Sequence, residues 1–504
     1  MTTDSDAAAA GEGTATVAAG SFAGIVRRGA MISGLTMALT QLISLMSLIW
    51  IARLLTPAEV GVYAAGTVLS AFLTSASEGG LRLALVQREN DVEDAADTVF
   101  WATAAAGLLG SLAALAAAPV LGFLFDNDMV AAVAVATSGL LLLESLTNVP
   151  DGLMQRRFNF LRKLVVDPSR TLAYAGVTIA LAASGFGVWS MVLGQYAAVI
   201  VWVIGSWSLG RWRPGRGRPS VRLWRELARF AYPLAIANLV VYVRETVQAV
   251  ITGRSLGAAA LGNYRYGLRI GNLAGNAVFE IGSYVLFPAF SRFAGDTDRL
   301  HAAFLRAMRW IWFAAVPVAA LVVSLGEQAV VVVLGAPWRD AGVFLVALAG
   351  AGLGFALQGV ANEAIKAVGR SALLHWTSAI ELLFGIGLVV LFLPLGLVGV
   401  GLAISVTEVL SGIVLLALAK PIVGYSVRSI VRLLYPPAIA GCVGAASVVV
   451  LMALFGAPTG LPTPMAVGAL AGLCLVLVLA YLAVIAALDR RLLSMLFGRL
   501  ARRS

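Results

Sequence analysis

The chain has 504 residues, of which 60% are hydrophobic and only 12% are charged, and its formal net charge is +10. A water-soluble protein cannot cover so many apolar side chains with polar surface, so this composition excludes a soluble globular protein and indicates a membrane protein. The lysines and arginines are spread over many loops and form no compact basic module, so we do not expect nucleic acid as a partner.

Apolar runs long enough to cross a bilayer recur along the chain. A helix of about 20 residues spans roughly 30 Å of hydrocarbon, and fourteen runs of that kind follow a tail (residues 1–24) that is expected to be disordered and cytoplasmic. The predicted spans lie near residues 29–52, 59–78, 98–123, 129–149, 166–184, 188–209, 231–252, 265–290, 304–325, 342–365, 373–393, 397–419, 436–456 and 464–487. The sequence therefore predicts an all-α integral membrane protein with about fourteen transmembrane helices.

A basic stretch divides the predicted spans into two groups. Residues 211–230 hold seven arginines and two prolines, which is typical of a loop and predicts a cytoplasmic linker. Six spans precede it and six follow before a final pair. The expected organisation is an N-lobe (25–210), the linker (211–230), a C-lobe (231–420), a further helix pair (421–488) and a basic amphipathic tail (489–504) that anchors on the inner leaflet.

The distribution of cationic residues predicts the orientation. Lysine and arginine accumulate in cytoplasmic loops. If the N-terminus is cytoplasmic, the outer loops hold only Arg53, Arg254 and Arg339. An even number of spans then places both termini in the cytoplasm.

One short motif occurs twice. "RLLTPAEVGVYAAG" begins at Arg53 and "RSLGAAALGNYRYG" begins at Arg254, and at a constant offset they share Arg, Leu, Ala, Gly, Tyr and Gly at six positions. Both copies follow the first predicted span of a half, and an even number of spans separates them. The motif therefore predicts two six-helix lobes related by a parallel repeat, with a pseudo-twofold axis along the membrane normal. Chance matching of common residues is the alternative.

The stretch "IARLLTPAEVGVYAAGTVLSAFLTSASEGGLRLALVQRE", followed by "DGLMQRRFNFLRKL", resembles the Wzx-type polysaccharide transport proteins of the multidrug, oligosaccharidyl-lipid and polysaccharide (MOP) exporter superfamily. The resemblance implies a flippase in a prokaryotic plasma membrane. Its implied substrate is an undecaprenyl-pyrophosphate-linked oligosaccharide repeat unit, moved to the outer leaflet by alternating access for polysaccharide or lipopolysaccharide synthesis. A polymerase and a chain-length regulator are implied partners.

Polar side chains gather on single faces of several predicted spans. A charge in the middle of a membrane helix costs about 2.5 to 3.5 kcal/mol, so such faces indicate a hydrated pathway, although small polar residues also mediate helix packing. Arginine and lysine suit the oxygens of a pyrophosphate, and amides and tyrosine suit a sugar. The cationic candidates are Arg244, Arg265, Arg269 and Lys366, and the neutral candidates are Tyr242, Asn272, Asn276, Gln358 and Asn362.

Several acidic residues within or at the ends of spans are candidates for coupling to an ion. A partly desolvated carboxylate can take up a proton or bind sodium, and the sequence does not choose between the two. The candidates are Glu245, Glu363 and Glu78, with Glu245 leading, and Glu381 and Glu408 also belong to the group. A static salt bridge between Glu245 and an arginine is the alternative.

Other classes of function fit less well. A multidrug antiporter of the same superfamily typically has twelve spans and an acidic residue in the first helix, which residues 29–52 lack. A lipid II flippase has cationic residues in its first helices, whereas the first span here is neutral. A glycosyltransferase would need acids on a large outer loop. No nucleotide loop or metal-ligand cluster occurs, so neither a cofactor nor a metal is expected.

Overall fold

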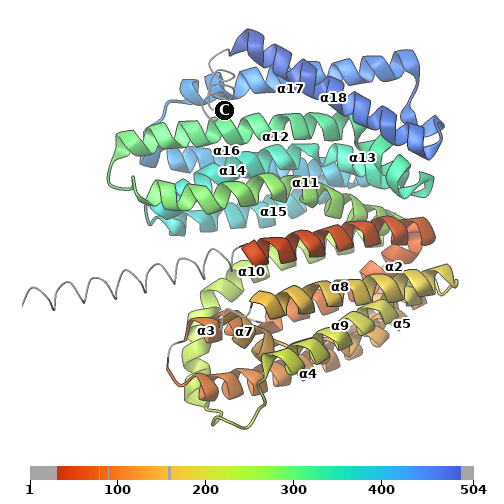
Figure 1. The fold of residues 1–504 in the computed structure, drawn as a ribbon, viewed down its shortest axis with the longest axis vertical. Helices are drawn as coiled ribbons and strands as arrows, with labels where there is room; N and C mark the ends of the chain where they lie inside the picture. The colour runs from red at the N-terminus through yellow and green to blue at the C-terminus, as the bar shows by residue number, and fades with distance from the viewer. Residues whose placement is uncertain (1–30, 79, 89, 157–159, 490–504) are drawn as a thin grey trace, which may run out of the picture. The chain divides into compact units, whose positions relative to one another are not determined.

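The computed structural model describes residues 31–78, 80–88, 90–156 and 160–489. The side chains of residues 75–78, 160–161, 233–235, 237–238 and 274–285 lie outside this description. Within these ranges the regular secondary structure is α-helix with a few 3₁₀ turns (Figure 1). The predicted tail at 1–24 and, except for Asp489, the predicted tail at 489–504 fall outside the described residues.

The first of two compact units contains residues up to Leu55, Leu69–Phe123 and Asp128–Leu239. It begins with the helix Met31–Leu54. Its other helices are the second part of α2 (Pro57–Glu78), α3 (Leu81–Gln87), most of α4 (Val92–Phe125), α5 (Asp128–Ser138), α6 (Leu140–Ser145), α7 (Asn148–Arg156), α8 (Phe160–Ala183), α9 (Val188–Gly210) and the first half of α10 (Val221–Leu256). Helices α8 and α9 pack side by side, and α3 packs against α7.

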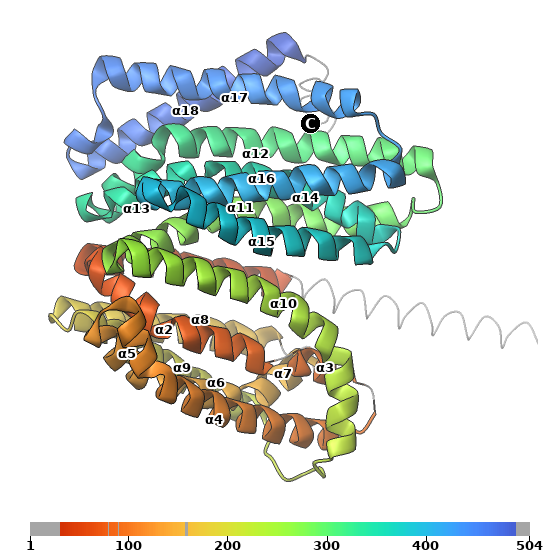
Figure 2. The ribbon, with the colours of Figure 1, turned by 180° about the vertical axis from the view of Figure 1, so that it is seen from behind.

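The second unit contains Thr56–Val68, Leu124–Asn127 and the chain from Val240 onward. Its helices are the second half of α10, α11 (Ala258–Ser291), α12 (Thr297–Leu334), α13 (Arg339–Ala347), α14 (Ala349–Ala367), α15 (Leu374–Phe392), α16 (Gly396–Val423), α17 (Val427–Phe455) and α18 (Thr463–Leu488). Helix α14 packs against α11 and α16, and α15 lies along α16 (Figure 2). Aromatic residues fill its core, where Phe304 stacks on Tyr425 with the ring centroids 5.3 Å apart.

Every one of the fourteen predicted spans falls on helix. Nine continuous helical stretches of the described chain are long and apolar enough to cross a membrane, and one of them, Ser371–Val423, contains both α15 and α16. Helices α2, α8, α10 and α11 are not among the nine, and the last three carry charged side chains along their length. The helical membrane fold is therefore as predicted, and the number of fourteen crossings stays a prediction.

Helix α10 begins ten residues earlier than the predicted span. The sequence places residues 221–230 in a linker, but the structure makes them helical. Leu223 and Leu227, one turn apart on the helix, are buried in the first unit, whereas Arg222 and Arg225 are exposed. The stretch is an amphipathic helix. Its arginines made the sequence resemble a loop, although its apolar face packs in the first unit.

The two halves of the chain share an interrupted fourth segment. In the first half the predicted span near 129–149 is broken into α5, α6 and α7, and in the second half the span near 342–365 is broken into α13 and α14. Breaks at equivalent positions in the helix order agree with the predicted parallel repeat.

The twice-occurring motif brings its two copies into contact within the second unit. A Cβ atom added to Gly61 would lie 1.7 Å from the carbonyl oxygen of Ala258, and one added to Gly262 would lie 1.9 Å from that of Pro57. Gly61 and Gly262 are equivalent positions of the motif, as are Pro57 and Ala258. The contact is therefore reciprocal, like the interface of a twofold dimer, and it requires glycine on both sides.

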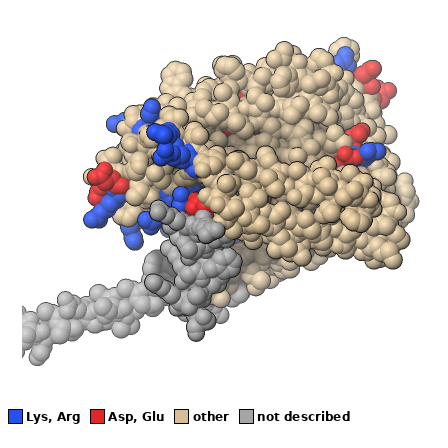
Figure 3. All heavy atoms as spheres, turned by 90° about the horizontal axis from the view of Figure 1, so that it is seen from above, with Lys and Arg blue, Asp and Glu red and all other residues tan. Residues whose placement is uncertain are grey.

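The outer face of the second unit is suited to lipid. Figure 3 shows lysine and arginine gathered mainly at one end of the helices, with a wide band between the ends that carries almost no charge. Large apolar side chains are exposed along the helices that face outward, among them Leu383, Leu454 and Phe455. An apolar belt between charged ends is the surface expected of a multi-pass membrane protein.

The close helix contact at Gly61 and Gly262 leads to a prediction about stability. Substituting Gly61→Ala or Gly262→Ala forces two helix backbones apart, and overpacking of this kind costs about 1 to 3 kcal/mol. Each variant is expected to have a lower apparent Tm in detergent, measured by tryptophan fluorescence. The control is Gly176→Ala on α8, where an added Cβ meets nothing within 4 Å, and its Tm should be unchanged or slightly higher. Equal Tm values for all three variants would contradict the tight crossing.

Candidate functional site

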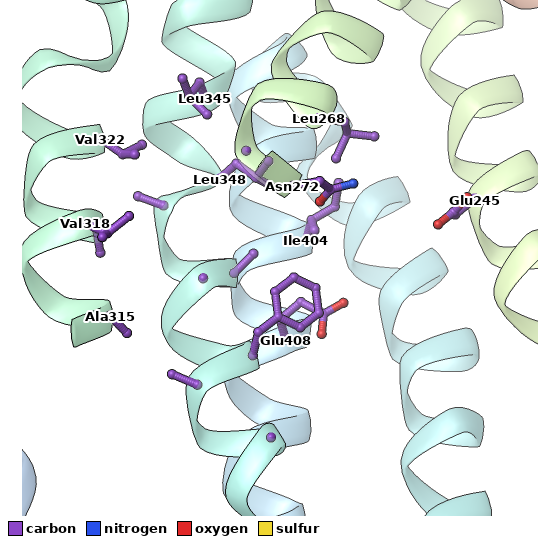
Figure 4. Close-up of a pocket in the computed structure, with 18 of the residues that line it drawn as sticks. Glu245, Leu268, Asn272, Ala315, Val318, Val322, Leu345, Leu348, Ile404 and Glu408 are labelled. Carbon is purple, nitrogen blue, oxygen red and sulfur yellow. The ribbon is translucent and has the colours of Figure 1, made fainter. Parts of the chain in front are cut away.

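A cavity of about 290 Å³ lies inside the second unit. Its polar lining comes from α10, α11 and α16, and its apolar lining comes mainly from α12, α13 and α14. Figure 4 shows Glu245, Asn272 and Glu408 on one side of this cavity and Val318 and Val322 of α12 on the other. A pocket with an apolar wall and a few convergent polar groups is the usual form of a ligand site.

Helical periodicity brings the polar lining together. On α10, Arg244 and Gln248 are four residues apart and share a face, and Glu245 also reaches the cavity. On α11, Leu268 and Asn272 have the same spacing.

An ion-pair cluster stands at the edge of this cavity. Arg244 Nη1 lies 2.8 Å from Glu408 Oε1 on α16 and 3.5 Å from Glu381 Oε2 on α15. Gln358 Nε2 on α14 donates to the other Glu408 oxygen at 2.8 Å. Four helices therefore meet around one guanidinium. Sequence analysis named these residues separately but did not predict that they meet.

The structure separates the predicted residues into several places. Arg244, Glu245 and Asn272 line the cavity, and Gln358 belongs to the ion-pair cluster. Tyr242, Arg265 and Arg269 lie on the same two helices, with Arg269 and Tyr242 exposed and Arg265 half-buried, but they are not part of the lining. The side chains of Asn276 and Glu78 lie outside the described residues.

The remaining predicted residues lie near the C-terminal end of α14. Lys366 Nζ lies 3.0 Å from Glu363 Oε1, and the Glu363 side chain is buried. Asn362 has a buried Oδ1 without a hydrogen-bond partner among the described groups. Lys366 and Glu363 thus neutralise each other, away from the cavity lining.

A second cavity, of about 540 Å³, lies inside the first unit and was missed by sequence analysis. Nine of its eleven lining residues are polar or charged, and only Met37 and Met154 are apolar. The polar ones are Ser33, Thr36, Thr40, Gln41, Gln155, Lys163, Asp167, Arg170 and Thr171. The helical spacing of Lys163, Asp167, Arg170 and Thr171 on α8 was the signal that could have revealed it.

The charges of the first unit are paired across helices. Arg82 Nη1 and Lys163 Nζ lie 3.0 Å and 3.4 Å from the same oxygen of buried Asp151. Arg170 Nη2 lies 3.6 Å from Glu144 Oε1, and its guanidinium covers the Trp202 ring at 4.1 Å from the centroid. These pairs hold Lys163 and Arg170 at the cavity wall, and the lining of the cavity remains hydrophilic.

The comparisons with known proteins agree with this architecture. A family model described as "Polysaccharide biosynthesis protein" matches residues 50–342. The succinoglycan biosynthesis transport protein ExoT of Rhizobium meliloti is 25% identical over 66% of this chain and 67% of its own length. The lipopolysaccharide biosynthesis protein WzxC of Escherichia coli is 22% identical over 77% of this chain and 79% of its own length.

Solved structures share the fold at low sequence identity. The lipid II flippase MurJ, in an inward closed conformation, aligns with a TM-score of 0.74 at 13% identity, over 92% of this chain and 100% of its own. A multidrug resistance MATE family transporter of the MOP superfamily, in an inward-facing conformation, aligns with a TM-score of 0.63 at 16% identity, over 76% of this chain and 94% of its own. The chain therefore belongs to the polysaccharide biosynthesis protein family, and it shares its fold with the MurJ and MATE structures.

Proposed function

We propose that the protein moves undecaprenyl-pyrophosphate-linked oligosaccharide repeat units from the inner to the outer leaflet of a prokaryotic plasma membrane by alternating access. The relatives named for succinoglycan and lipopolysaccharide biosynthesis support a polysaccharide precursor as the cargo. A precursor of this kind has an anionic head, a hydroxyl-rich glycan and an apolar tail, so the binding site needs cationic, neutral polar and apolar surfaces together.

The observation that carries the proposal is a pair of arginines on one face of α11. Arg265 and Arg269 are four residues apart, and like charges at this spacing repel each other. Neither forms an ion pair with a carboxylate among the described side chains, whereas Arg244 and Lys366 do. An anion that bridges the two guanidinium groups would remove the repulsion, and a pyrophosphate offers the oxygens that their paired N–H donors fit.

Neighbouring side chains support the position of this anion site. Arg269 lies between Leu268 and Asn272, both of which line the cavity of the second unit. Arg244 and Lys366, the other two predicted pyrophosphate ligands, are each neutralised by glutamate. We therefore assign the pyrophosphate to Arg265 and Arg269 in preference to the other two.

The glycan requires hydrogen-bonding groups without a strong net charge. Asn272 offers such groups in the cavity of the second unit and Tyr242 offers one on the exposed surface of α10, and the amides of Gln41 and Gln155 offer them in the cavity of the first unit. Gln358 is engaged with Glu408, so we give it a smaller role in sugar binding than the sequence alone suggests.

Removing the charge of Arg269 tests the anion site. A hydrogen bond to a charged group is worth about 1.5 to 3 kcal/mol, so Arg269→Ala should lower the flipping rate at least about 10-fold. Arg269→Lys should restore part of the rate, because it returns the charge without the planar fork. The rate is measured in proteoliposomes that carry the labelled lipid-linked oligosaccharide purified from cells lacking the gene.

The matched control is Arg299→Ala. Arg299 is 73% exposed at the start of α12 and pairs only locally, with Asp296 three residues before it. Its variant should insert and transport like the wild type. Wild-type transport by Arg269→Ala would show that Arg269 is structural and that the anion binds elsewhere.

Deleting the gene tests the cargo itself. If the proposal holds, a pyrophosphate-linked repeat unit accumulates in the inner leaflet and the mature polysaccharide falls, as measured by mass spectrometry of extracted lipids. Accumulation of lipid II would favour a lipid II flippase. Unchanged glycans with altered drug resistance would favour a multidrug antiporter.

A further inference from the structure

The cluster around Arg244 contains one positive charge and two negative charges. The guanidinium contacts Glu381 on α15 and Glu408 on α16, and the polar groups that face the cluster from α14 and α11, Gln358 and Tyr264, are neutral. Glu245, the next residue on α10, adds a negative charge nearby, and Arg265, which follows Tyr264 on α11, adds a positive one, so together they leave the balance of the cluster unchanged. An unbalanced negative charge within a membrane helix bundle is costly. A bound proton would remove this imbalance.

The two carboxylates are held differently, which decides where that proton binds. Both oxygens of Glu408 are occupied, one by Arg244 and the other by Gln358, and its side chain is only 2% exposed. Glu381 has one contact, at 3.5 Å, and is 19% exposed. Protonating Glu408 would break two short hydrogen bonds, whereas protonating Glu381 breaks one long contact at a position that water can reach.

The backbone beside Glu408 is also closely packed. A Cβ atom on Gly354 of α14 would lie 2.4 Å from the carbonyl carbon of Glu408, and one on Gly412 of α16 would lie 3.1 Å from the Gly354 oxygen. Helices α14 and α16 therefore touch at this level and hold Glu408 in a fixed place. Beside Glu381 the packing is looser, since a Cβ atom on Gly385 of α15, one turn away, would lie 3.3 Å from the Thr407 methyl carbon of α16 and 3.8 Å from Arg244 Cδ. At this level α15 therefore meets side chains and not a neighbouring backbone.

We propose that Glu381 is a proton-binding site and that Arg244 acts as a charged arm between α15 and α16. With the proton on Glu381, Arg244 pairs with Glu408 alone and the cluster is neutral. When the proton leaves to water, the Glu381 carboxylate competes for the same Nη1 atom and draws α10 and α15 together. If the proposed flippase function holds, this movement is the step that couples proton flow to transport.

The geometry favours a proton over a metal cation. A metal cation needs several oxygen ligands, but Arg244 already lies between the two carboxylates, and Gln358 presents an N–H donor there. A cation would have to displace a guanidinium that holds a 2.8 Å contact. A proton needs only one carboxylate oxygen.

Infrared titration of the purified protein tests the site without any substrate. The wild type should show a protonated-carboxyl carbonyl band that disappears as the pH is raised, and this band should be absent from Glu381→Gln. The control is Glu327→Gln, a glutamate paired with Arg339 at the far end of α12, and it should keep the band. If Glu381→Gln retains the band, or the wild type lacks it, the proposal is wrong. If adding sodium at constant pH removes the band, the site binds a sodium ion in place of the proton and the proposal is wrong.

A transport measurement separates this proposal from the proposed function. In proteoliposomes with the purified lipid-linked oligosaccharide, a pH gradient should accelerate wild-type flipping, and Glu381→Gln should flip at one rate with or without the gradient. If the wild type flips nothing but the infrared band behaves as expected, the substrate is wrong and the proton site stands. If Glu381→Gln still responds fully to the gradient, the coupling role of Glu381 is wrong.

Discussion

An unpaired charge is costly in hydrocarbon, and this constraint accounts for much of the structure. In the first unit Asp151 is met by Arg82 and Lys163, and in the second Glu408 is met by Arg244 and Gln358. Burying ion pairs of this kind gives little net stability, because desolvation offsets the attraction. Apolar residues of similar size would hold the helices at least as well. The presence of these ion pairs inside an otherwise apolar fold is therefore best understood through what the charged residues bind or transmit.

The two cavities have different linings. That of the first unit is hydrophilic on nearly every side, whereas that of the second combines a polar wall on α10, α11 and α16 with an apolar wall on α12 to α14. Both lie within helices whose outer faces are apolar. The protein thus reverses the arrangement of a soluble protein, with its water-compatible surface in the interior. This division of surfaces is what a carrier of a polar head on an apolar tail requires.

The sequence predicts the helices well because hydropathy acts locally. Every predicted span falls on helix, but α10 and α17 begin ten and nine residues early and α12 ends nine residues late. At the start of α10, arginines mask a buried stripe that includes Leu223 and Leu227. The stripes on α10 and α11 could also be predicted from spacing. The partners of Arg244 could not, since Glu408 lies 164 residues further along the chain and several other glutamates were equally available. Which of them meets Arg244 depends on how α15 and α16 pack.

The cavity of the first unit was missed for a related reason. Lys163 lies beside Arg162 in a basic stretch and was assigned to a loop, so the face that it forms with Asp167 and Arg170 on α8 was not considered. Positive charges near helix ends have two uses in a membrane protein. They set the orientation of the helices in the membrane, or they line a pathway. Which of the two applies depends on the neighbouring helices.

The reciprocal crossing at Gly61 and Gly262 bears on how such a chain arises. Pro57 and Ala258 occupy equivalent places in the two copies, and each receives the glycine of the other. A half-length ancestor that carried one copy would make the same contact with a second molecule of itself, as twofold dimers do. After duplication and fusion, each glycine is constrained by the opposite copy and not by its own surroundings. The two copies are then expected to drift freely around these positions while the glycines themselves stay fixed.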